Sequence, residues 1–186
     1  MSSLSLPRPA PDESATFYHG YIDKVPGTQI GEYLVNQLQE VERLLAPLDD
    51  AAARFRYAPE KWSVKEVLGH LSDAERIFSY RLLRIGRADS TPLPGFDENA
   101  YVPPAAFDAR PMADLVREFK AVRASTIALV EGLPSEAWQR RGQASGKSIG
   151  TRALTYIMVG HVTHHLGVLR ERYRLSSSPD ALAAVS

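Results

Sequence analysis

Residues 156–173 read YIMVGHVTHHLGVLRERY, and this stretch decides the fold class. Its β-branched residues, such as Ile157 and Val159, favour a strand by residue type. The spacing of its apolar residues and histidines favours a helix instead, because they recur every three or four positions for more than four turns. The recurring positions are Leu154, Ile157, Met158, His161, His165, Val168 and Leu169. No segment of the chain alternates convincingly with period two, so we expect an all-α protein.

The same helical period recurs in three other stretches. It predicts a helix over about residues 29–48, a second over 63–85, and a third that starts near Pro111 and includes Val130. The second has a clear start, because Ser63 can cap it and Glu66, three residues on, completes a capping box. Gly86 then ends it.

Residues 87–110 connect the second helix to the third. They include Pro92, Pro94, Pro103 and Pro104, which forbid a long helix, so we expect an irregular segment. Four amphipathic helices with one long connection predict a four-helix bundle with a long crossover between helices 2 and 3. We expect three parts: an N-terminal arm over 1–27, loosely ordered or wrapping, the bundle over 28–175, and a flexible C-terminal tail over 176–186.

The amino-acid composition argues against several classes of function. The 186 residues include 22 Lys+Arg and 22 Asp+Glu, so the formal net charge is zero, which argues against nucleic acid as a partner. There is no Cys, so a metal site has to use His and carboxylates. No apolar run is long enough to span a membrane, and the first residues lack the apolar core of a signal peptide. We therefore expect a soluble, cytoplasmic protein that does not bind membranes.

Four of the five histidines lie in the expected helices. His161 and His165 are four residues apart, so they lie one above the other in the middle of the apolar stripe of the last helix, with His164 on its flank. His70 borders the apolar face of the second helix. A buried imidazole without a partner is costly, and one divalent ion can satisfy several at once.

Two interpretations of these histidines stay open. Three imidazoles and a water make an open metal site of the catalytic type, whereas single helical histidines are usually structural. A zincin protease is excluded, because Val162 stands where the motif H-E-x-x-H requires the catalytic Glu.

Other polar residues near these histidines are weaker candidates. Asp73 could accept a hydrogen bond from His70, but for both Asp73 and Glu75 we favour a solvated carboxylate on the helix surface. The crossover residues Asp97, Glu98 and Tyr101 could line the mouth of a pocket. Residues 142–148, GQASGKS, lack the spacing of a phosphate-binding loop, and we expect a flexible turn in which Ser148 caps the last helix.

Three segments together resemble the DinB/YfiT-like superfamily. They are KWSVKEVLGHLSDAERIFSYRL at 61–82, TPLPGFDENAY at 91–101 and YIMVGHVTHHLGVLRERY at 156–173, and the resemblance spans most of residues 30–173. It implies a four-helix bundle that binds a divalent metal, Zn, Ni, Mn or Fe, through His70, His161 and His165.

The resemblance also implies possible activities. Some members are S-transferases or isomerases that use a low-molecular-weight thiol such as bacillithiol, mycothiol or glutathione, and others have been called metal-dependent hydrolases. We expect a metal-dependent enzyme that transfers such a thiol cosubstrate to a small electrophilic substrate. Hydrolysis, or a non-catalytic metal-binding bundle in the stress response, are the alternatives. Several members are dimers, so we expect a homodimer.

Overall fold

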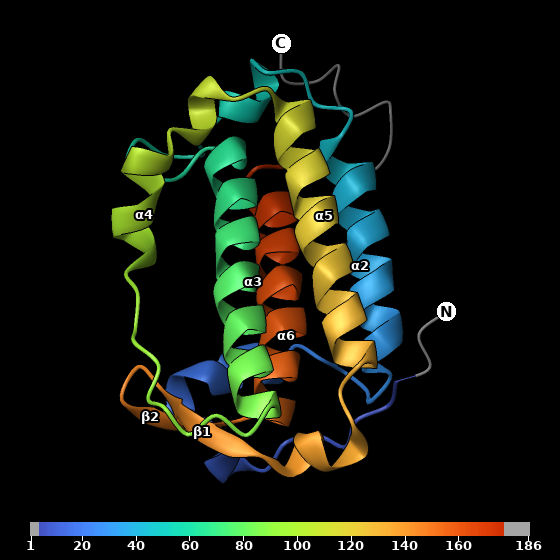
Figure 1. Cartoon of the computed structure of the whole chain (residues 1–186). Helices are drawn as coiled ribbons and strands as arrows, with labels where there is room; N and C mark the ends of the chain where they lie inside the picture. Colours follow the sequence, from blue (N-terminus) through green and yellow to red (C-terminus); the bar gives the residue numbers. More distant parts are fainter. Residues whose placement is uncertain (1–3, 177–186) are drawn as a thin grey trace.

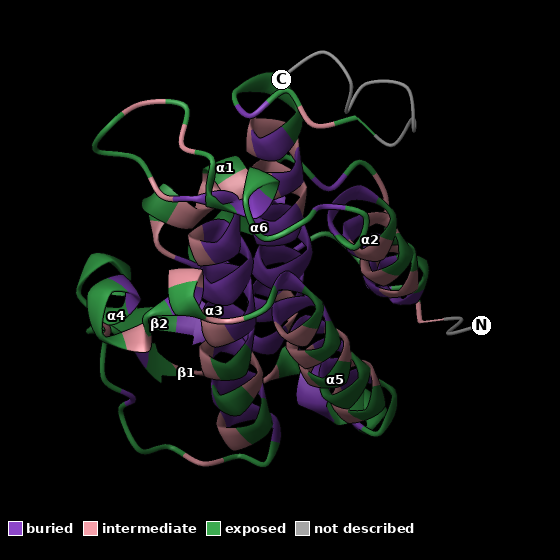
Figure 2. Cartoon of the chain, turned by 90° about the horizontal axis from the view of Figure 1, so that it is seen from above, coloured by how far each residue is buried: buried purple, intermediate pink, exposed green. Residues whose placement is uncertain are grey.

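The computed structural model describes residues 4–176 and confirms a four-helix bundle. The bundle helices are α2 (Ile30–Leu45), α3 (Val64–Gly86), α5 (Met112–Glu131) and α6 (Thr151–Glu171). Each of α2 and α3 packs against both α5 and α6. Figure 2 shows α3 and α6 as the most buried helices, whereas α2 and α5 each expose one face. No helix in the described part of the chain is long and apolar enough to cross a membrane.

The connection between α3 and α5 explains the order of the helices. These two helices are neighbours that run in the same direction, so the chain has to return along the full length of the bundle between them (Figure 1). Residues 87–111 make this return on the outside of the bundle. The expected long crossover is therefore confirmed, and it leaves α6 as the antiparallel neighbour of α3.

The predicted capping box at the start of α3 is confirmed by its two hydrogen bonds. The Glu66 backbone N–H donates to Ser63 Oγ at 3.0 Å, and the Ser63 N–H donates to Glu66 Oε2 at 2.8 Å. Such a reciprocal cap satisfies two backbone donors that the first turn leaves free. α2 ends at Leu45, three residues before the expected end, because Pro47 has no backbone N–H with which to continue the helix.

Two expectations about the connections are wrong. The crossover contains a short helix, α4 (Glu98–Ala105), in which Asp97 accepts backbone N–H bonds at the start; Pro103 and Pro104 lie in its last turn. Residues 141–150 form a hairpin of β1 (Arg141–Ala144) and β2 (Lys147–Gly150) instead of a flexible turn.

The hairpin forms because of its turn residues, and its short strands show no alternation of apolar residues that would predict it. Its two turn residues, Ser145 and Gly146, both adopt positive φ angles (54° and 72°), the conformation of the tight turns that match strand twist. Ser148 therefore lies inside β2, and Gly150 occupies the cap position of α6 without a side-chain cap.

Residues of the N-terminal arm pack on the bundle. Leu6, Ile22 and Val25 are buried in the core, and Tyr156 of α6 donates a hydrogen bond to the Leu6 carbonyl at 2.8 Å. The arm contains the one-turn helix α1 (His19–Ile22), which packs on α6. The division into three parts stays a prediction, and the expected tail lies outside the described residues except for Ser176.

A buried polar network connects all four bundle helices. Arg123 of α5 forms two hydrogen bonds, each 2.6 Å long, with the Glu75 carboxylate of α3. It also donates to the Gln37 side chain of α2 at 2.9 Å, and Gln37 donates to the Val159 carbonyl of α6 at 2.7 Å. Glu75 is thus a buried partner of Arg123, and the expectation of a solvated surface carboxylate is wrong.

The backbone of the arm passes close to α6 at Gly160. A Cβ atom there would lie 1.9 Å from the Tyr21 carbonyl oxygen, so only glycine fits. We expect Gly160→Ala to displace the arm and to lower the free energy of unfolding by about 1–3 kcal/mol through overpacking. Urea denaturation of the purified proteins measures this change.

Gly167 supplies the matched control in the same helix. No atom lies within 4 Å of a Cβ built there, so Gly167→Ala is expected to stabilise the protein by up to about 1 kcal/mol through helix propensity. Equal effects of the two alanines would contradict the close packing of the arm on α6.

Candidate metal centre

Three histidines from two helices converge between α3 and α6. His70 comes from α3, and His161 and His165 come from successive turns of α6. One ring nitrogen from each lies within 4.8 Å of the other two, and the Nε2 atoms of His70 and His161 are 3.0 Å apart. The structure therefore brings together the three residues that the sequence singles out.

Burial keeps these imidazoles neutral. His70 and His161 are 7% and 5% exposed. Desolvation lowers the pKa of His70 to about 4 and that of His165 to about 3, with the neighbouring imidazoles adding to the shift of His165. Burial, followed by the charges of the other two histidines, also holds the pKa of His161 well below its usual value. At neutral pH each ring therefore keeps a free lone pair.

The donor set fits a divalent metal. Ligand nitrogens about 2.1 Å from one ion lie roughly 3.0–3.4 Å apart, which is close to the spacing of the His70 and His161 nitrogens. Three neutral nitrogens suit Zn, Fe or Ni, and they leave coordination positions open for a further ligand. Three protein ligands with an open position are the arrangement of catalytic sites rather than structural ones.

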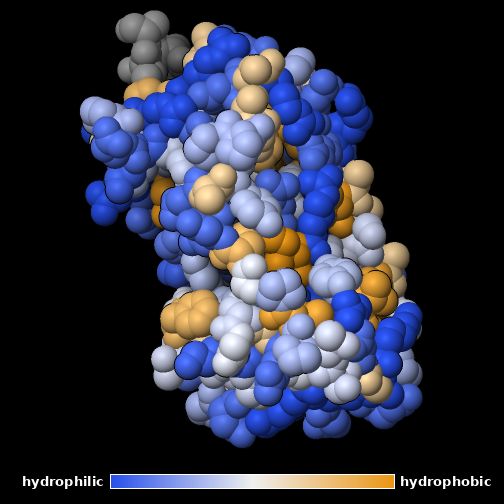
Figure 3. All heavy atoms as spheres, turned by 60° about the vertical axis from the view of Figure 1, so that its left-hand side comes forward, coloured by the Kyte–Doolittle hydropathy of each residue, from blue (hydrophilic) through white to orange (hydrophobic). Residues whose placement is uncertain are grey.

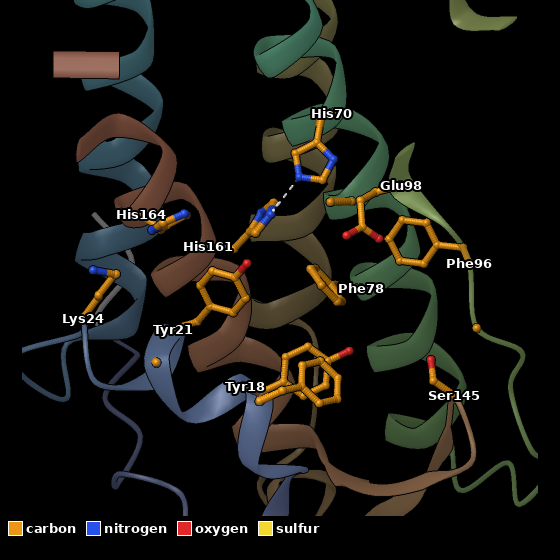
Figure 4. A pocket seen from close by; sticks show the side chains of 14 residues that line it. Tyr18, Tyr21, Lys24, His70, Phe78, Phe96, Glu98, Ser145, His161 and His164 are labelled. Carbon is orange, nitrogen blue, oxygen red and sulfur yellow. Dashed lines mark hydrogen bonds between the residues drawn. The ribbon is translucent and has the colours of Figure 1, made fainter. Parts of the chain in front are cut away.

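A cavity of about 660 Å³ opens beside the histidines. Its walls come from α3, α6, the crossover, the hairpin and the N-terminal arm (Figure 4). The lining residues are Phe17, Tyr18, Gly20, Tyr21, Lys24, His70, Ala74, Phe78, Gly95, Phe96, Glu98, Ser145, His161 and His164. Figure 3 shows hydrophobic side chains gathered in the middle of an otherwise mainly hydrophilic face on the crossover side. The volume lies in the range of small-molecule pockets.

The charged groups of the pocket lie on opposite sides of the histidines. Glu98 lies on the side of Phe96, whereas Lys24 lies beside His164 (Figure 4). Glu98 is the single carboxylate among the described lining residues, and Lys24 the single ammonium. Of the three crossover residues considered for a pocket mouth, only Glu98 lines the pocket.

The remaining candidates have other partners. Asp97 caps α4, and Tyr101 contacts Phe96 with ring centres 5.6 Å apart. Asp73 forms an ion pair with Arg76 at 3.4 Å rather than a hydrogen bond with His70. Its side chain is half-buried, and desolvation raises its pKa, so it is less solvated than expected.

The sequence does not predict several aromatic contacts to the histidines. Tyr21 of the arm packs edge-on against His161 and His164, with ring centres 5.3 and 5.6 Å apart. Trp62 lies 4.8 Å from the His70 ring. Tyr21 is far from α6 in sequence and belongs to no periodic pattern, so only the fold places it there. His164 lines the pocket but lies outside the group of three.

Comparison with known proteins decides the family. Residues 33–169, which include all three histidines, match the DinB superfamily. The chain belongs to the DinB superfamily. No curated protein matches the sequence closely enough to count as a relative.

A solved structure shares the bundle of this DinB superfamily chain. YfiT from Bacillus subtilis, described as a probable metal-dependent hydrolase with an unusual four-helix bundle topology, is 18% identical. The similarity covers 92% of this chain and 95% of YfiT, with a TM-score of 0.65. At this identity the likeness establishes the fold, and it extends beyond the family match into the N-terminal arm.

The lowered pKa values in this DinB superfamily protein predict how its metal-free stability depends on pH. Below a pH of about 6.5 the unfolded chain binds protons on His70 and His161, while the folded protein does not until about pH 4 for His70. Stability is therefore complete above about pH 6.5 and falls as the pH is lowered. We expect His70 to account for a loss of about 2 kcal/mol between pH 7 and pH 5, and His161 to change stability in the same direction.

Urea denaturation of chelator-treated protein at both pH values measures this loss. His70→Gln, which cannot titrate, should show a smaller loss than wild type by about 2 kcal/mol. The same loss in both proteins would mean that His70 is protonated in the folded state at pH 5.

Proposed function

We propose that this protein is a metal-dependent enzyme acting on a small molecule held in the pocket. One observation carries the proposal: three imidazole nitrogens converge on one point, and two of the three histidines, His70 and His161, line a cavity of about 660 Å³. His70, His161 and His165 would hold a divalent ion, Zn, Ni, Mn or Fe. The absence of Cys means that a thiol nucleophile has to come from a cosubstrate.

The reaction we propose first is transfer of a low-molecular-weight thiol, of the bacillithiol or glutathione type, to an electrophilic substrate. A divalent metal in such a site lowers the pKa of a ligand thiol or water, so that the nucleophile forms near neutral pH. The Glu98 carboxylate lines the same pocket and can accept the proton of the nucleophile. Phe78, Phe96 and Tyr21 add aromatic surface to the walls of this pocket.

Hydrolysis is the second candidate, and the description of YfiT favours it. The same residues serve both reactions, because Glu98 can accept a proton from water as well as from a thiol. The two candidates differ in whether turnover requires an added thiol. A homodimer in the cytoplasm, without nucleic acid as a partner, stays part of the proposal.

Metal content is the first test. Protein purified without a histidine tag should contain about one equivalent of divalent metal by elemental analysis, because the three histidines form one site. His161→Ala should contain less than about a tenth of an equivalent, since two imidazoles bind such ions weakly.

His164→Ala is the matched control, because it removes a neighbouring imidazole outside the group of three. It should keep its metal. Metal below a tenth of an equivalent in the wild type, unchanged by His161→Ala, would refute both catalytic proposals and favour a bundle without a metal site.

Glu98 supplies a test of catalysis. With metal-loaded protein, we expect consumption of a monochlorobimane-type electrophile to depend on added bacillithiol or glutathione. Glu98→Gln should lower kcat by about 100-fold or more, the typical contribution of a general base. Asp97→Asn is the control, because it removes the neighbouring carboxylate and keeps a residue that caps α4 well.

The outcomes separate the candidates. Turnover of ester or amide substrates without thiol, lost in Glu98→Gln, would replace thiol transfer by hydrolysis. Full metal content without either activity would favour the non-catalytic metal-binding protein.

A further inference from the structure

The pocket follows one face of α3, and Arg81 comes next along this face. His70, Ala74 and Phe78 line the pocket from successive turns of the helix. Arg81 lies three residues beyond Phe78 and about 16 Å along the helix axis from His70. Helical side chains lean toward the N-terminus of their helix, so the guanidinium leans back toward the pocket.

Pocket residues surround the Arg81 guanidinium. Its Nη2 donates to Ser145 Oγ at 3.1 Å and to the Pro94 carbonyl at 2.9 Å. Its central carbon lies 5.9 and 5.8 Å from the ring centres of Phe78 and Phe96. Ser145, Phe78 and Phe96 all line the pocket, so the guanidinium lies directly behind the wall at the end opposite His70.

Arg81 is an unusual buried cation. The residue is 1% exposed, and its Nη1 is buried without a hydrogen-bond partner. Within residues 4–176, no carboxylate forms an ion pair with it, whereas the buried Lys65 and Arg123 pair with Asp50 and Glu75. Buried charges in proteins are normally paired, so an unpaired guanidinium beside a pocket indicates a counter-ion that the chain does not supply.

The wall in front of Arg81 can open without unfolding a helix. The Ser145 side chain is exposed in the turn of the hairpin, and Phe96 is half-buried in a part of the crossover without regular structure. Both side chains contact the guanidinium, Ser145 through Nη2 and Phe96 through its ring, so rotation of either would open space beside it. An anion that enters there can accept from Nη1 and from the Ser145 hydroxyl.

We propose that this end of the pocket is an anion subsite in which Arg81 binds the carboxylate of the enzyme's substrate or cosubstrate. The aromatic walls between Arg81 and the histidines fit an apolar or aromatic body. The ligand is then a small organic acid whose carboxylate meets Arg81 while its other end faces the three histidines. Only the assignment of that other end rests on the proposed function.

A pair of probes that differ in charge alone tests the subsite. We choose 3-phenylpropionate and 3-phenylpropionamide, and titrate each into chelator-treated protein by calorimetry. Working without metal prevents the carboxylate from binding at the histidines. Wild-type protein should bind the acid about ten-fold or more tightly than the amide, because a hydrogen-bonded ion pair with a guanidinium is stronger than a neutral contact.

Three variants identify the cation responsible. Arg81→Met should bring the two affinities within about two-fold of each other. Arg84→Met, which removes an equal charge from the same helix but pairs with Asp89, should keep the preference. Lys24→Met removes the ammonium on the opposite side of the pocket and should also keep it. Loss of the preference in Lys24→Met but not in Arg81→Met would overturn the proposal.

The wild-type comparison stands even if Arg81→Met fails to fold. Equal affinities for acid and amide in wild-type protein would show that no cation contacts the carboxylate and would refute the subsite. That result leaves the metal proposal intact, because no metal is present in the titration. Conversely, a protein that binds no metal but prefers the acid would keep the anion subsite and lose the proposed enzyme.

Discussion

The ion pair between Arg123 and Glu75 holds the bundle in the arrangement on which the site depends. Together with Gln37 it connects α5, α3, α2 and the backbone of α6 through one chain of buried hydrogen bonds. A buried pair of this kind adds little net stability, but breaking it leaves an unpaired charge in the core, at a cost of about 3–5 kcal/mol. Alternative registers of the helices are therefore strongly disfavoured.

This network also fixes the position of the histidines along the axes of α3 and α6. Gln37 binds the Val159 carbonyl, two residues before His161, and Glu75 lies five residues after His70. A sliding of α6 along α3 would separate the imidazoles, but it would first break the hydrogen bonds around Arg123. The positive charge of Arg123 contributes to the lowered pKa of His161, after burial and the other histidines. The polar network thus positions the site and helps to keep it neutral.

The sequence predicts those features that depend on local spacing. The four-residue separation of His161 and His165 places both on one face of α6, and the Ser63–Glu66 box sets the start of α3. These features need only neighbours along one helix. For the last helix, the spacing of apolar residues predicted the structure correctly, although the residue types favoured a strand.

The features that the sequence did not predict all involve partners distant in the chain. Glu75 looks like a surface carboxylate until Arg123, 48 residues away, is placed beside it. The hairpin depends on two positive φ angles rather than on alternation of apolar residues. The arm carries no helical period, so nothing in it indicates that Tyr21 would meet His161.

The pocket combines residues from two segments of the chain, the N-terminal arm and the bundle that carries the histidines. The family match begins at residue 33 and includes all three histidines, whereas Phe17, Tyr18, Tyr21 and Lys24 precede it. The three histidines and the arm's side of the pocket therefore belong to separate segments of the chain. An exchange of the arm would change the pocket wall and leave the three histidines in place, but it would have to supply new side chains for the core positions of Leu6, Ile22 and Val25 and keep the close backbone contact at Gly160.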